Sequence, residues 1–74
     1  MPPLPLLPPR VVLKALAKVG YRLDRVTGSH HVLVHPDRPP VSVPVHKGRD
    51  MKKGTLRGII RDTGLTEAEF LKLV

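Results

Sequence analysis

The residues best suited to chemistry in this chain are four histidines, two of which are adjacent and follow a glycine–serine pair. Gly28-Ser29-His30-His31 is followed by His35 and then by Pro44-Val45-His46. Imidazole exchanges protons near neutral pH, so two suitably placed histidines can accept a proton from one oxygen and donate one to another. Cleavage of RNA through its 2′-hydroxyl needs such transfers, together with positive charge that holds the phosphate.

Positive charge is abundant in the chain. Thirteen Lys and Arg against six Asp and Glu give a net charge of +7 in 74 residues. The basic residues concentrate between Lys47 and Arg61, where Asp50 is the one acid. A chain this basic favours polyanions such as nucleic acid, or an acidic protein surface. The cluster predicts an RNA-backbone contact through Lys47, Lys52, Lys53 and Arg57, although a charged helix face can also be merely solvated.

Other kinds of site are poorly supplied. The absence of cysteine excludes disulfides and thiolate metal sites and is consistent with a cytoplasmic protein. His31 and His35 share a strand face but lie about 13 Å apart at 3.3 Å per residue, too far to bind one zinc ion. No nucleophile elbow surrounds Ser29, and no apolar run approaches the roughly 20 residues of a membrane span. We therefore expect no metal, no small-molecule cofactor and no membrane contact.

Helices are predicted on both sides of the histidine-rich segment. Pro8-Pro9 sets the backbone for a helix start, and Gly20 ends that helix. Asp50 is a candidate N-cap for a second helix that stops at Gly64. Thr66-Glu67-Ala68-Glu69 has the spacing of a capping box and opens a short third helix. Residues 1–9 form a proline-rich N-terminal arm, and residues 10–74 form a single domain.

Three short strands are predicted between the first two helices. Tyr21–Val26, His31–His35 and Val41–His46 alternate in part between apolar and polar residues, and turn residues separate them. Pro44 lacks an N–H donor, which assigns the third strand to a sheet edge. The expected fold is α+β, of the order α-β-β-β-α plus a short C-terminal helix, with a three-stranded antiparallel sheet covered by helices on one face.

The pairing of the last two strands decides which histidines meet. If the loop Pro36–Pro40 closes symmetrically about Arg38, His30 lies opposite His46. Directly opposed side chains have Cβ atoms roughly 4.5–5.5 Å apart, so two imidazoles would flank one phosphate. A slip of the register removes this arrangement. The alternative is that His46 only caps the strand or bonds to the backbone.

The turn before His30 allows a structural and a functional interpretation. Gly28 permits a positive φ and a close approach of the backbone to a ligand, and the structural role is favoured for it. Ser29 can donate to a phosphate oxygen or close the turn through its hydroxyl.

An ordered set of motifs resembles the family of HicA-type toxins. The set comprises a helix, Gly20-Tyr21, Gly28-Ser29-His30, a strand ending at His35-Pro36, Val43-Pro44-Val45-His46 and Lys52-Lys53-Gly54-Thr55-Leu56. The ending Leu65-Thr66-Glu67-Ala68-Glu69-Phe70 is also similar, so the resemblance covers about residues 10–74. Gly-Ser-His alone is a weak signal, whereas the ordered set is specific. The proline arm departs from the family pattern.

The resemblance implies a fold like that of double-stranded-RNA-binding domains, ribosome-independent cleavage of mRNA, and neutralisation by a HicB-type antitoxin protein that occludes the catalytic histidine. The catalytic histidine of the family corresponds to His30, and in some members it lies one position later, at His31 here. His46 as a second catalytic group follows from the predicted register and not from the family. The other hypotheses are a non-catalytic double-stranded-RNA-binding module and an adaptor for an acidic protein.

Overall fold

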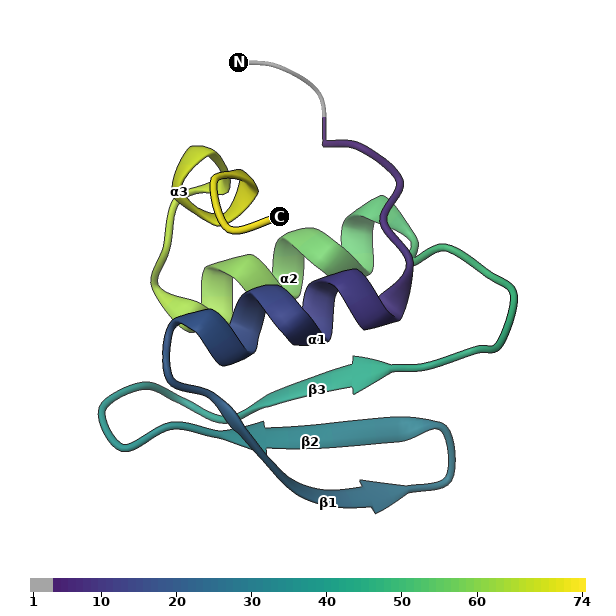
Figure 1. Cartoon of the computed structure of the whole chain (residues 1–74), viewed down its shortest axis with the longest axis horizontal. Coiled ribbons are helices and arrows are strands. Elements are labelled where there is room, and N and C mark those ends of the chain that lie inside the picture. Colours follow the sequence, from purple (N-terminus) through teal and green to yellow (C-terminus); the bar gives the residue numbers. More distant parts are fainter. Residues whose placement is uncertain (1–3) are drawn as a thin grey trace.

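Figure 1 shows a computed structural model of the chain, which describes residues 4–74. Helices and one sheet follow in the predicted α-β-β-β-α order, with a short helix at the end. The elements are α1 (Pro9–Lys18), β1 (Arg22–Thr27), β2 (His30–Val34), β3 (Val41–Pro44), α2 (Lys53–Thr63) and α3 (Glu67–Leu71). The predicted α+β architecture is therefore confirmed. None of the helices within residues 4–74 is long and apolar enough to cross a membrane.

The sheet is an antiparallel meander in the order β1-β2-β3, as the sequence predicts. β3 forms one edge, so Pro44 lies where a missing N–H is tolerated. The helices lie on the β3 side of the sheet in Figure 1, and all six residues of β1 are exposed. Two apolar side chains of this uncovered strand, Leu23 and Val26, are 52% and 50% exposed.

The predicted pairing of β2 with β3 is wrong by two residues. His30 lies opposite Pro44, and Val32 lies opposite Ser42, so His46 does not face His30. The pairs are symmetric about position 37 rather than Arg38, because the chain leaves the strand early at His35. The His35 Nε2 is 2.8 Å from the Val19 carbonyl oxygen, and its Nδ1 accepts the Asp37 N–H at 2.9 Å. When the centre of the turn moves by one residue, the partner of each β2 residue on β3 changes by two positions. Because side chains alternate with a period of two, every side chain stays on its expected face of the sheet.

The helix boundaries follow local signals, with one exception. Pro9 is the first residue of α1, and Gly20 has the positive φ of 98° that suits a helix stop. Thr66 and Glu69 form the predicted capping box of α3. The expected N-cap Asp50 is wrong, because α2 begins at Lys53 with Lys52 as its N-cap and without a side-chain cap.

The core lies between the helices and the covered face of the sheet. Val12 and Leu16 of α1, Leu56 and Ile60 of α2, and Val43 of β3 are almost fully buried. This layered arrangement leaves the other face of the sheet open to solvent.

The N-terminal arm contributes to the same core. Residues 1–3 of the predicted arm lie outside the described residues, but Leu4 and Leu7 are 2% and 8% exposed. The Met51 N–H donates to the Leu7 carbonyl at 2.9 Å, which ties the arm to the segment before α2. The side chains of Leu4, Leu7 and Met51 belong to one hydrophobic cluster with the two long helices.

Candidate functional site

Several segments that are distant in sequence meet at one end of the molecule, on the right in Figure 1. They are the β1–β2 turn, the loop after β3 and the first turns of α1 and α2. The turn carries Gly28, Ser29 and His30, and the loop carries His46 and Lys47. The fold therefore brings most of the residues singled out in the sequence to the same end of the protein.

His30 is the first residue of the central strand and is exposed. Its cross-strand partners are Thr27 on β1 and Pro44 on β3. Because directly paired residues share a face, all three side chains lie on the open face of the sheet. The imidazole is thus accessible to a large substrate on a rigid backbone.

The turn before His30 contains only Gly28 and Ser29, because Thr27 pairs directly with His30. Gly28 has φ 57°, and Ser29, like every non-glycine residue from 4 to 74, has no positive φ, which is the pattern of a type II′ hairpin turn. The Ser29 carbonyl accepts the Val45 N–H at 2.7 Å, so β3 also holds the turn. The conformation thus requires Gly28 for a structural reason, and it fixes the backbone that presents His30.

His31 points to the opposite side of the sheet, toward the helices. It lies opposite Val26 and Val43, and its Nδ1 is buried without a hydrogen-bond partner. A polar atom that is buried without a partner costs the folded state free energy. This geometry suits His31 to packing better than to proton transfer.

His35 is occupied by structural hydrogen bonds. Both ring nitrogens are engaged, and the ring packs on Tyr21 with centroids 4.9 Å apart. Since Nδ1 accepts the Asp37 N–H, Nε2 carries the proton that it donates to the Val19 carbonyl. Neither ring nitrogen is therefore free for catalysis.

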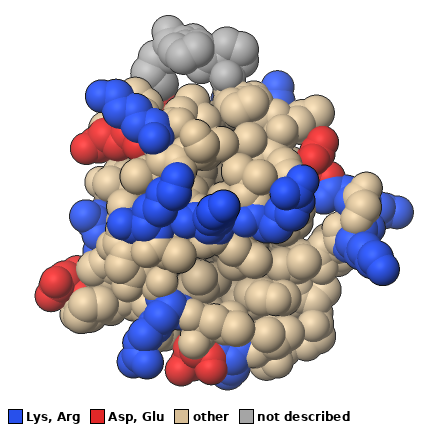
Figure 2. All heavy atoms as spheres, viewed as in Figure 1, with Lys and Arg blue, Asp and Glu red and all other residues tan. Residues whose placement is uncertain are grey.

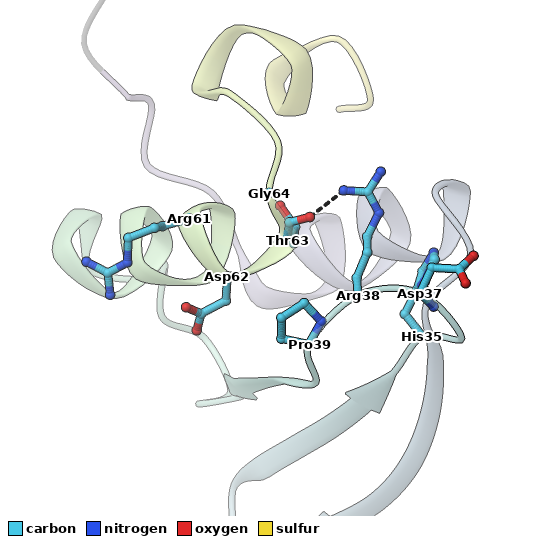
Figure 3. A pocket seen from close by; sticks show the side chains of 8 residues that line it. All are labelled: His35, Asp37, Arg38, Pro39, Arg61, Asp62, Thr63 and Gly64. Carbon is cyan, nitrogen blue, oxygen red and sulfur yellow. Dashed lines mark hydrogen bonds between the residues drawn. The ribbon is translucent and has the colours of Figure 1, made fainter.

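His35 also lines a cavity of about 530 Å³ at the end of the molecule away from His30, drawn in Figure 3. There Arg38 donates to the Thr63 carbonyl and satisfies the last turn of α2. The Arg61 and Asp37 side chains point away from each other in Figure 3, so the charged groups do not converge on one ligand. The cavity is best explained as the junction between the β2–β3 loop and α2.

His46 lies beyond the end of β3 and borders two adjoining cavities of about 310 and 370 Å³. The first is also lined by Arg49, Lys52 and Thr55, and the second by Arg10 and Lys47. Asp50 borders both cavities, but the cations outnumber it. The dipole of α2 adds positive potential at the start of the helix. This potential is not offset locally, because the first turn contains no acid and the N-cap makes no side-chain hydrogen bond. The arrangement suits a phosphate-bearing ligand.

Arg57 lies apart from the other predicted backbone contacts. Arg57 forms an ion pair with Glu67 of α3 at 3.3 Å and borders a separate shallow cavity beside Ile60 and Leu65. Lys53 is exposed at the first position of α2, next to Lys52. The structure therefore groups Lys52 and Lys47 with His46, whereas Arg57 joins α2 to α3.

Arg25 lies near His30, a placement that the sequence pattern did not predict. An irregularity in β1 between Leu23 and Arg25 places Arg25 opposite Val32, on the same open face as His30. His30 and Arg25 are diagonal neighbours, a separation that a long side chain can span. The Arg25 guanidinium forms an ion pair with the exposed carboxylate of Asp24 at 2.7 Å. A bulge leaves no signature in the alternation of residue types, so the sequence offered no signal for this placement.

Neither aromatic side chain is available to stack on a base. Tyr21 is 3% exposed and Phe70 is fully buried. Within residues 4–74, no three His, Asp or Glu side chains are grouped so that they could hold a metal ion.

Comparison with protein families assigns the chain. A family model described as "HicA toxin of bacterial toxin-antitoxin" matches residues 9–65, which is more than three quarters of the sequence. Comparison with curated proteins gives no significant match. The matched region runs from the first residue of α1 through the end of α2 and includes His30, His31 and His46. The chain therefore belongs to the HicA family of toxins from bacterial toxin–antitoxin systems.

Proposed function

We propose that this protein is the toxin of a toxin–antitoxin pair and acts in the cytoplasm as a metal-independent endoribonuclease that cleaves mRNA. The observation that carries the proposal is the exposed His30 on a fixed two-residue hairpin, at the end of the molecule where Lys47, Lys52 and His46 gather. Membership of a toxin family supports it. A solvent-facing imidazole at the same end of the molecule as several cations supplies two of the groups that RNA cleavage needs.

In this reaction the ribose 2′-oxygen attacks the adjacent phosphorus, and the bond from phosphorus to the 5′-oxygen breaks. His30 acts at one of these two oxygens, either accepting the proton from the 2′-hydroxyl or donating one to the leaving 5′-oxygen. Water completes the other transfer. Cations near the phosphate stabilise the negative charge that grows in the transition state.

His46 is assigned to phosphate binding rather than to proton transfer. Pro44, not His46, is the residue opposite His30, so the two imidazoles do not face each other across the ladder. His46 instead shares a cavity with Arg49 and Lys52. On this assignment His46→Ala weakens RNA binding and leaves the rate at saturating RNA largely intact.

The partner is proposed to be a HicB-type antitoxin protein that covers His30. Family membership implies an antitoxin. Because His30 is exposed on the open face of the sheet, a protein partner could bind over it. An acidic binding surface on the antitoxin would match the net charge of +7. Co-expression with the product of the adjacent gene, followed by purification of a complex and loss of cleavage, tests this part of the proposal.

Cleavage of a long mRNA at low salt in EDTA tests the enzymatic proposal. Wild type, His30→Ala and His31→Ala are compared on a denaturing gel, with folding monitored by circular dichroism. We expect fragments from wild type and none from folded His30→Ala. Cleavage by His30→Ala but not by folded His31→Ala would move the catalytic role to His31. Cleavage that EDTA abolishes would contradict the metal-independent mechanism.

A non-catalytic double-stranded-RNA-binding module is the second candidate. Tyr21 and Phe70 are buried, so RNA binding cannot use stacking of bases on these aromatic side chains. Binding through the RNA backbone and helix shape is typical of double-stranded-RNA-binding modules, which favours this candidate. Intact RNA in every lane, with a gel shift by wild type and His30→Ala that fades as salt rises, would support this candidate and exclude the enzyme.

A further inference from the structure

The outer face of α1 carries a stripe of basic residues, of which Arg10 borders the candidate site and Lys14 and Lys18 lie beyond it. Arg10, Lys14 and Lys18 are all exposed and are spaced at i, i+4 and i+8, so they form one stripe along the helix. At 1.5 Å per residue the stripe is about 12 Å long. The opposite side of α1 is buried through Val12 and Leu16, and the helix contains no acid.

The stripe continues into the loop after β3. Arg10 lines the cavity of about 370 Å³ together with Lys47 and Arg49. Figure 2 shows the face on which α1 lies in front, where Lys and Arg side chains form a row across the middle of the molecule. The acidic side chains visible on this face lie toward its margins. We call Arg10, Lys14, Lys18, Lys47 and Arg49 the α1 row.

The charges of the α1 row are not neutralised within the fold. Among residues 4–74 the ion pairs join Arg25 to Asp24 and Arg57 to Glu67, and neither includes a member of the row. Lys18 donates to the Leu73 carbonyl at 2.8 Å, a contact that does not cancel its charge. Like charges at i, i+4 repel one another. A bound polyanion would relieve this repulsion, and a solvent-exposed row favours a long ligand over a small one.

We propose that the α1 row extends the contact surface for the phosphate backbone of RNA from the candidate site along α1. The inference rests on the proposed function, because it extends the RNA that His30 cuts along an additional face. The row begins at the end of the molecule that carries His30, so one chain of RNA can engage both. Its contribution to affinity is independent of sequence and falls with salt. The row thus retains mRNA while the chemistry takes place at His30.

The test measures RNA affinity against salt concentration with a double variant, Arg10→Gln and Lys14→Gln. Lys18 is left in place because it contacts Leu73. The matched control is Arg22→Gln with Lys72→Gln, which removes two exposed charges outside the row and also lowers the net charge from +7 to +5. The probe is a 2′-O-methyl RNA, which cannot be cleaved through the 2′-oxygen.

We expect the slope of log affinity against log salt to fall by about 1.5 in the double variant, at roughly 0.7–0.9 for each lost phosphate contact. The control should keep the wild-type slope. In cleavage assays the double variant should need more RNA than the control variant for half-maximal rate. Should the double variant fail to fold, Arg49→Gln removes a cation from the loop end of the row and should lower the slope by one contact.

Each other outcome overturns the inference in a different way. Equal slopes for the double variant and the control, in a wild type that cleaves RNA, would remove the α1 row and leave the proposed function standing. A wild type that neither binds nor cuts RNA would remove both. Unchanged RNA binding with weakened antitoxin binding would reassign the row to an acidic protein surface.

Discussion

Pro44 lies directly opposite His30 in the ladder between β2 and β3. The next pair, Ser29 and Val45, lies toward the β1–β2 turn and is hydrogen-bonded, because the Val45 N–H donates to the Ser29 carbonyl at 2.7 Å. Pro44 and His30 therefore form the closely spaced, non-hydrogen-bonded kind of pair. The Pro44 nitrogen points away from β2, so its missing N–H costs no ladder bond. The pyrrolidine ring gives His30 a rigid neighbour on the open face.

Replacing His31 with valine should leave the free energy of unfolding unchanged or raise it. The His31 Nδ1 is buried without a partner between the cross-strand neighbours Val26 and Val43, and an apolar side chain removes that unsatisfied atom. Urea denaturation of the variant measures the effect, with exposed His30→Val as the control. A loss of more than about 1 kcal/mol in His31→Val would show that the imidazole makes a stabilising contact.

Leu4→Ala should lower the free energy of unfolding by about 2 kcal/mol or more, because this arm residue is 2% exposed within the core cluster. Leu6→Ala is the matched control, since Leu6 is 60% exposed and lies two residues away. Its effect should stay within about 0.5 kcal/mol. Equal urea midpoints for the two variants would mean that the arm does not contribute to the stability of the fold.

Tyr21→Phe should cost about 1 kcal/mol near neutral pH, because the Tyr21 hydroxyl donates to the Pro39 carbonyl at 2.9 Å in a partly buried position. Burial raises the pKa of Tyr21 above its ordinary value of 10.0. The folded state therefore favours the neutral phenol, and this stability is present below about pH 10 and is lost as pH rises through the raised pKa. The stability gap between wild type and Tyr21→Phe should narrow in alkali. A gap that widens there would contradict the assignment.

Glu69→Gln should make the protein less sensitive to acid. The Thr66 backbone N–H, and then the Thr66 side chain, lower the pKa of Glu69 below its ordinary value of 4.5. The carboxylate thus contributes stability above that ordinary value, and the contribution is lost as pH falls through the lowered pKa. Glutamine keeps the capping-box hydrogen bond without titrating. Thermal unfolding from about pH 6 to about pH 3 should show wild type losing more stability than the variant. Parallel losses would show that the capping box does not depend on charge.

The parts of the fold that depend on near neighbours in the chain were predictable. Pro9 begins α1, Gly20 and Gly64 follow helix ends with positive φ, and Thr66 with Glu69 caps α3. Each of these effects acts within a few residues. The N-cap of α2 was the exception, because the chain from Val45 to Lys52 is positioned partly by the bond between Met51 and Leu7, a contact across 44 positions.

The candidate site was predictable in its residue types but not in its geometry. Gly28, Ser29 and His30 stand out in the sequence because glycine and serine favour a tight turn and histidine titrates near neutrality. The register that pairs His30 with Pro44 depends on His35, whose ring bonds to Val19 and to Asp37. A hydrogen bond to a carbonyl sixteen residues earlier has no signature in the alternation of a strand.

The sequence by itself determined the family, the order of helices and strands and the strong positive charge, because these depend on residue type, local spacing and composition. Only the tertiary structure decided which side chains share a face and which are covered. It exposed His30, buried the Nδ1 of His31 and aligned Arg10 with Lys47 and Arg49. Burial and proximity arise when segments distant in the chain pack together to remove apolar surface from water, and that packing depends on all of them at once.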